Sequence, residues 1–107
     1  MQAMRERRID LPQDKIVAFC KKWQVAELSL FGSVLRDDFR ADSDIDVLVH
    51  FSTDAKPTIF DLVRMEDEME QILGREVDLI ERAGVEQSRN YIRRKAILES
   101  AEAIYAA

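Results

Sequence analysis

Three aspartates lie where their type and spacing could do chemistry. Asp44 and Asp46 flank the first residue of the apolar run IDVLVHF at 45–51, and Asp78 lies within the run EVDLIE at 76–81. Residues two apart in a strand point to the same face, so Asp44 and Asp46 should project together. Adjacent carboxylates repel each other unless a cation lies between them, and magnesium prefers oxygen ligands. The pair therefore predicts a magnesium site.

Asp78 adds a third carboxylate to this site if its strand lies beside the strand at 45–51. Three carboxylates can hold two magnesium ions about 3.5–4 Å apart, with one ion bridging phosphates and the other helping to deprotonate and place an attacking hydroxyl. Asp78 would then be a metal ligand and a candidate general base. The residues expected to carry catalysis and bind metal are Asp44, Asp46 and Asp78.

Gly32 and Ser33 predict a phosphate-binding segment upstream of the aspartates. Glycine permits close backbone approach and unusual dihedral angles. If a short helix runs from Ser33 to about Asp38, its first N–H groups and the Ser33 hydroxyl can bind phosphate oxygens. Arg36 follows one turn later and can reach a triphosphate.

The elements that must position these residues follow from hydrophobic periodicity and turn residues. We expect strands at 25–31, 45–51 and 76–81, and helices from Pro12 in the first helical position, at 59–73 before Gly74, and from Ser88 as N-cap to about Glu99. Residues 83–87 are expected to be a connection, and the tail AEAIYAA is either a helix extension or an edge strand. This order predicts an α/β or α+β fold with a small mixed sheet flanked by helices.

Composition limits the classes of protein that this chain can belong to. Its 107 residues, 47% of them hydrophobic, are expected to form one domain over 1–107, with residues 1–10 a loose segment. There is no signal-peptide pattern or membrane-spanning run, and the single cysteine, Cys20, excludes an intramolecular disulfide, so the expected location is the reducing cytoplasm. The net charge of −5 argues against tight nucleic-acid binding.

Several of these residues also have purely structural interpretations. Asp44 and Asp46 alone could form a solvated turn. His50 lies an even number of residues after the two aspartates, so it should point to the same face of the strand. It is nevertheless expected to be a partly buried structural residue rather than part of the site. The basic run Arg93-Arg94-Lys95, with Arg89, is either an exposed helix face or a contact for nucleotide or RNA.

The spacing of these motifs resembles that of the polymerase-β-type nucleotidyltransferases. Gly32-Ser33 is followed after ten residues by Asp44-Ile45-Asp46, and Asp78 lies in a later apolar strand. From about residue 12 to 106 the chain is similar to the minimal nucleotidyltransferases within that superfamily. The resemblance implies the nucleotidyltransferase fold, two Mg²⁺ ions held by the three aspartates, and a triphosphate held by Gly32, Ser33 and Arg36. Asp37 departs from the family pattern by adding negative charge beside the phosphate segment.

The same resemblance implies a biological role. Minimal nucleotidyltransferases are antitoxins paired with helical HEPN-domain toxins, and the implied reaction transfers AMP from ATP to a tyrosine hydroxyl of the toxin, a ribonuclease. Two alternatives stay open: a non-catalytic antitoxin or scaffold that masks the toxin, and a nucleotidyltransferase acting on a small molecule such as an antibiotic. The sequence leaves the nucleotide base open and is compatible with a homo-oligomer.

Overall fold

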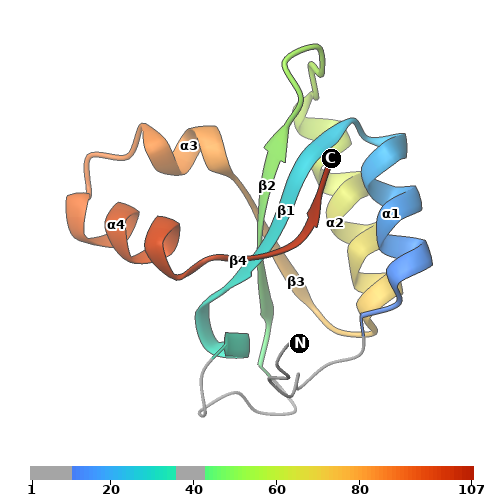
Figure 1. Cartoon of the computed structure of the whole chain (residues 1–107), viewed down its shortest axis with the longest axis horizontal. Coiled ribbons are helices and arrows are strands. Elements are labelled where there is room, and N and C mark those ends of the chain that lie inside the picture. Colours follow the sequence, from blue (N-terminus) through green and yellow to red (C-terminus); the bar gives the residue numbers. More distant parts are fainter. Residues whose placement is uncertain (1–10, 36–42) are drawn as a thin grey trace.

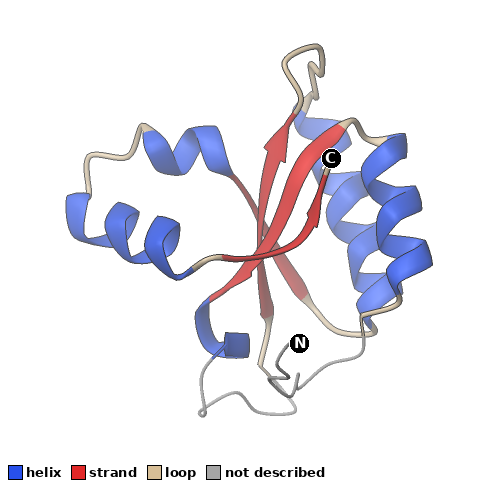
Figure 2. Ribbon diagram, viewed as in Figure 1, coloured by secondary structure: helices blue, strands red, loops and turns tan. Residues whose placement is uncertain are grey.

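A four-stranded mixed sheet forms the centre of the molecule, with helices on both sides (Figures 1 and 2). The computed structural model describes residues 11–35 and 43–107. Its strands are β1 (Val25–Phe31), β2 (Ile45–Phe51), β3 (Val77–Glu81) and β4 (Glu102–Ala106), and its helices are α1 (Gln13–Lys22), α2 (Ile59–Leu73), α3 (Arg82–Glu86), α4 (Tyr91–Ser100) and the 3₁₀ turn η1 (Gly32–Leu35). The predicted fold class is confirmed.

The sheet is mixed because its connections differ. The strand order is β3-β2-β1-β4, with β1 antiparallel to both of its neighbours and β2 parallel to β3. The crossover between the two parallel strands is α2, as a parallel connection requires. It is this parallel pair that brings the two aspartate-bearing segments side by side.

Each face of the sheet carries its own apolar layer. Alternate residues of β2, among them Ile45, Val47 and Val49, pack with α1 and α2 in the larger core. Leu48, on the opposite face, packs in a smaller cluster with Phe31 and Ile97, on the side of α3 and α4 (Figure 1). The two layers follow from the period of two in a strand. The smaller layer leaves room for a cavity beside it.

The long helix α2 begins and ends where its sequence predicts. The Thr58 hydroxyl accepts a hydrogen bond from the Asp61 backbone N–H, and the Asp61 carboxylate accepts one from the Thr58 backbone N–H, which forms a capping box. Gly74 ends the helix in the left-handed conformation with φ +72°. Met65 and Met69 of this helix are fully buried in the larger core.

Three predicted boundaries are wrong. Pro12 is the N-cap of α1 rather than its first helical residue, so the helix begins one residue later. Residues 82–86 form the short helix α3, where a connection was expected. Asn90, not Ser88, caps α4: its side chain accepts from the Arg93 N–H, while the Ser88 hydroxyl accepts from the Asn90 N–H. Both polar residues can cap a helix, and only the surrounding contacts select one.

The C-terminal tail is the edge strand β4, which settles the alternative that the sequence leaves open. Ala101 ends α4 with an extended backbone, and β4 then pairs antiparallel with β1. Ile104 and Tyr105 pack against the larger core. Partial burial of these two side chains and the strand pairing favour the strand over a longer helix.

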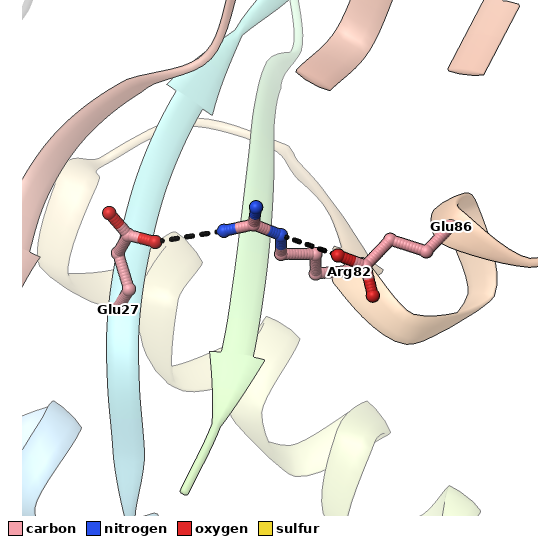
Figure 3. Close-up of polar contacts among 3 residues, drawn as sticks. All are labelled: Glu27, Arg82 and Glu86. Carbon is pink, nitrogen blue, oxygen red and sulfur yellow. Dashed lines mark hydrogen bonds and ion pairs between the residues drawn. The ribbon is translucent and has the colours of Figure 1, made fainter. Parts of the chain in front are cut away.

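Arg82 fixes α3 to the sheet (Figure 3). Its guanidinium lies across β2 and donates to Glu27 on β1 at 3.0 Å and to Glu86 of α3 at 3.1 Å. All three side chains are partly exposed, so the ion pairs orient α3 more than they stabilise it.

Among the described residues, no helix is long and apolar enough to span a membrane.

Candidate active site

Gly32 lies directly against Asp46 at the end of the β1–β2 pair. Phe31 is the partner of Asp46 in the antiparallel register, and the chain then turns into η1 with Gly32 at φ +80°. A Cβ atom at position 32 would overlap the Asp46 carboxylate oxygen Oδ2 and lie 3.2 Å from its Cγ. Position 32 therefore requires glycine both for its backbone angle and for space.

Asp46 and Asp78 are direct partners in the parallel register of β2 and β3. Side chains at paired positions of neighbouring strands point to the same face, here the face that carries α3 and α4. A backbone hydrogen bond from Ile45 N–H to the Glu76 carbonyl, 2.9 Å long, fixes this end of the pair. The structure thus brings these two aspartates together, as the proposed metal site requires.

Asp44 lies one residue before β2 and is exposed. Within residues 11–35 and 43–107, no three histidine, cysteine, aspartate or glutamate side chains come close enough to hold a metal ion. Asp44, Asp46 and Asp78 therefore share one end of the sheet without forming a closed ligand set. Their roles stay predictions.

The other predicted phosphate-binding residues are described only in part. Ser33 lies in the backbone of η1, directly after Gly32, but its side chain is outside the described set. Arg36 and Asp37 lie in the undescribed segment 36–42, as does the end of the short helix expected to reach Asp38.

A cavity of about 510 Å³ opens beside Gly32 and Asp46. Its walls come from the end of β1, η1, β2, α4 and the start of β4, and its lining residues are Phe31, Gly32, Leu35, Asp46, Arg93, Ala96, Ile97, Ser100 and Glu102. This volume lies in the range of small-molecule sites, roughly 300–1,000 Å³. The lining contains both apolar and charged side chains, which suits a ligand that has a ring system and an ionic group.

Sequence reasoning did not place α4 or β4 at this site. Arg93, Ser100 and Glu102 line the cavity with Asp46, although they follow it by about half the chain. The basic run at 93–95 indicated a nucleotide contact as one alternative, but the sequence did not show which of its residues lines the cavity. His50 is exposed rather than partly buried, because it lies near the far end of β2, where Glu27 is its register partner.

Comparison with known proteins places the chain in a family. The sequence profile of the nucleotidyltransferase domain matches residues 14–103. That span includes β1, η1, β2, β3 and the cavity. The chain therefore belongs to the nucleotidyltransferase domain family.

One curated relative is a candidate protein adenylyltransferase of Methanocaldococcus jannaschii (strain ATCC 43067), MJ0435. It is 41% identical over 66 residues, a match that covers 62% of this chain and 69% of the relative.

Two solved structures share the fold. A candidate minimal nucleotidyltransferase superposes with a TM-score of 0.65 at 29% identity, covering 84% of this chain and 86% of that one. A crystal structure of a toxin–antitoxin with AMP-PNP gives a TM-score of 0.67 at 16% identity, covering 91% of this chain and 75% of that one. At that identity the second match shows a common fold alone.

Proposed function

We propose that the chain is a magnesium-dependent protein adenylyltransferase that forms a single catalytic domain and acts in the cytoplasm. It transfers AMP from ATP to a tyrosine hydroxyl of a HEPN ribonuclease toxin. By this reaction it acts as the antitoxin of that toxin. The observation that carries the proposal is the register of Asp46 opposite Asp78, with Gly32 against Asp46 at the mouth of a cavity. The relative named as a candidate protein adenylyltransferase supports the reaction class. The toxin–antitoxin structure with AMP-PNP supports the partner and the nucleotide.

The proposed reaction is a displacement at the α-phosphorus of ATP. The tyrosine oxygen forms a new bond to that phosphorus, the bond to the bridging oxygen of the β-phosphate breaks, and pyrophosphate leaves with the electron pair. Asp78, which is exposed beside Asp46, accepts the hydroxyl proton. The backbone N–H groups of Gly32 and Ser33, with Arg36, hold the phosphate oxygens.

The donor set fits magnesium, because Asp44, Asp46 and Asp78 offer carboxylate oxygens and no soft ligand. Magnesium bound there would neutralise charge on the phosphates and acidify the attacking hydroxyl. Without a cation the carboxylates would repel the triphosphate, so their proposed role is to hold magnesium at this end of the sheet.

Transfer of label from α-labelled ATP to the co-expressed toxin tests the reaction. Asp44→Asn combined with Asp46→Asn should lower the labelling rate by about a hundredfold or more, because the carboxylates that would hold magnesium against the phosphates are lost. The matched control is Asp54→Asn with Asp67→Asn, two exposed aspartates away from the cavity, which should label at the wild-type rate. Labelling that survives in the first double variant would refute the proposal.

A second candidate function is supported by one observation: the described carboxylates do not form a closed set of three metal ligands. A non-catalytic antitoxin that masks the toxin would need the fold but not the charges. Growth rescue in cells that express the toxin separates the two functions. If the Asp44→Asn, Asp46→Asn variant rescues growth as well as the wild type, the chain masks its partner; we expect rescue to be lost.

A further inference from the structure

The three cations at the start of α4 differ in their neighbours among the described residues. Arg94 donates to the Ser88 carbonyl at 2.7 Å. The charged groups of Arg94 and Lys95 lie over the Tyr91 ring, 5.4 Å and 6.0 Å from its centroid. Both cations therefore have neighbours on their own helix and the turn before it.

Arg93 differs because it lines the 510 Å³ cavity together with Gly32 and Asp46. Arg93 and Arg94 both border a second hollow of about 230 Å³ between α3 and α4, so only the larger cavity distinguishes Arg93. Among the residues that the structure describes, no carboxylate forms an ion pair with Arg93. Its guanidinium is thus available to a ligand in the cavity.

An anionic ligand in this cavity needs cations that offset its charge and that of the lining. Asp46 and Glu102 contribute negative charge to the lining, and Arg93 is the basic residue in the described part of it. A triphosphate brought beside two carboxylates is repelled unless cations offset the charge. An arginine presents a planar fork of donors that matches phosphate oxygens.

The apolar residues of the lining suit the remainder of a nucleotide. Phe31, Leu35, Ala96 and Ile97 give an apolar wall on the same cavity. A ligand whose ring system packs on these side chains would have Gly32, Asp46 and Arg93 in the same cavity to meet its phosphates. Stacking and burial would hold the ring, and charge would hold the phosphates.

We propose that Arg93 is a substrate-binding residue that contacts phosphate oxygens of the nucleoside triphosphate from α4. The inference rests on the proposed function and deepens it, since it assigns a phosphate contact outside the glycine–serine segment and the aspartates. Arg94 and Lys95 have no such role.

Binding of AMP-PNP and of adenosine, measured by calorimetry with magnesium present, tests this assignment. Arg93→Gln should weaken AMP-PNP binding by about tenfold or more, the effect of losing a charge-assisted contact, and leave adenosine binding unchanged. Arg93→Lys should bind AMP-PNP with intermediate affinity, because it keeps the charge without the fork. The control is Arg89→Gln, which removes the same charge from an exposed residue that lines neither hollow.

Each outcome supports or overturns the assignment. Unchanged AMP-PNP binding in Arg93→Gln overturns it, as does an equal loss for AMP-PNP and adenosine, which would mean that Arg93 only shapes the cavity. Equal weakening by Arg89→Gln would indicate a general charge effect and also overturn it. If the wild-type chain binds no nucleotide, the proposed function fails too, and that failure is visible before any variant is made. Should Arg93→Gln not fold, Arg93→Lys carries the test.

Discussion

Both the backbone angle at position 32 and the closeness of Asp46 restrict this position to glycine. Its φ of +80° belongs to the left-handed region, and a Cβ atom there would overlap the Asp46 carboxylate. Gly74 has a similar φ of +72° but has no atom within 4 Å of such a Cβ. Alanine substitutions at these two positions can therefore be compared to separate the cost of backbone strain from the cost of steric overlap at the site.

Gly32→Ala should be the more damaging of the two alanine substitutions. Each variant carries a left-handed strain of about 1–2 kcal/mol. Gly32→Ala adds an overpacking cost of about 1–3 kcal/mol and displaces Asp46, so it should also lose AMP-PNP binding. Urea denaturation gives the free energies of unfolding, and calorimetry gives the affinities.

Gly74→Ala is the control, with nucleotide binding expected at the wild-type level. Equal losses of stability in both variants would show that the overlap with Asp46 relaxes at no cost. The close approach of Gly32 would then play no part in placing the carboxylate.

At the scale of elements, Glu68 joins the end of α1 to α2. It accepts hydrogen bonds from Lys22 Nζ at 2.6 Å and from Trp23 Nε1 at 3.1 Å. Burial alone would raise the pKa of Glu68, but the hydrogen bonds from Lys22 and Trp23 outweigh it and hold the pKa below its usual value. The folded state therefore favours the ionised carboxylate.

Glu68→Gln should lower stability at neutral pH and make no difference in acid. A depressed pKa contributes stability above the usual value of 4.5, and this contribution is lost as the pH falls through the folded pKa. Because Lys22 and Glu68 are partly exposed, the loss at pH 7 should be under about 1 kcal/mol. Thermal melts of both proteins at several pH values measure it.

Asp67→Asn serves as the comparison, since Asp67 is an exposed carboxylate on the same helix, beside Glu68. It should change stability little at any pH. A difference between Glu68→Gln and the wild type that persists at pH 3 would contradict the assignment to an ionised Glu68.

At the scale of the whole molecule, residues of all four strands pack in or against the larger core. It contains Cys20, which is fully buried between α1 and the sheet. Burial raises the pKa of the Cys20 thiol to about 12. The thiol is therefore protonated and inaccessible as long as the whole domain stays folded.

Stability should consequently decline at high pH. Below about pH 9 the Cys20 thiol is neutral in both the folded and the unfolded state. Above that pH the thiol ionises first in the unfolded state. The contribution of Cys20 to the free energy of unfolding is therefore lost as the pH rises toward the folded pKa of about 12. Denaturation at pH 8 and pH 10 measures the decline, and Cys20→Ala, though less stable overall, should show a smaller one. An identical decline in Cys20→Ala would assign it to other groups.

Labelling of Cys20 by a thiol reagent gives a second readout. The native protein should react only through global unfolding, at a rate that rises with denaturant. Rapid labelling in native buffer would mean that α1 opens locally.

The sequence by itself determined the elements whose signals are local. The strands at 25–31 and 45–51 were predicted to the residue, because alternation of apolar and polar side chains depends only on neighbours along the chain. Gly74 likewise ended α2 as predicted, through a conformation that glycine adopts without strain. The short helix α3 was not predicted, because its five residues include a glycine and are too few to show a hydrophobic periodicity.

The spacing of Gly32, Asp44, Asp46 and Asp78 is a property of the sequence, but their proximity is not. Whether Asp78 lies beside Asp46 depends on β3 pairing in parallel with β2, and that pairing results from the packing of α2 and many distant side chains. The position of Arg93 in the cavity and the pairing of β4 with β1 have the same origin. Such contacts join residues far apart in the chain, so their energies appear only when the whole sheet is assembled.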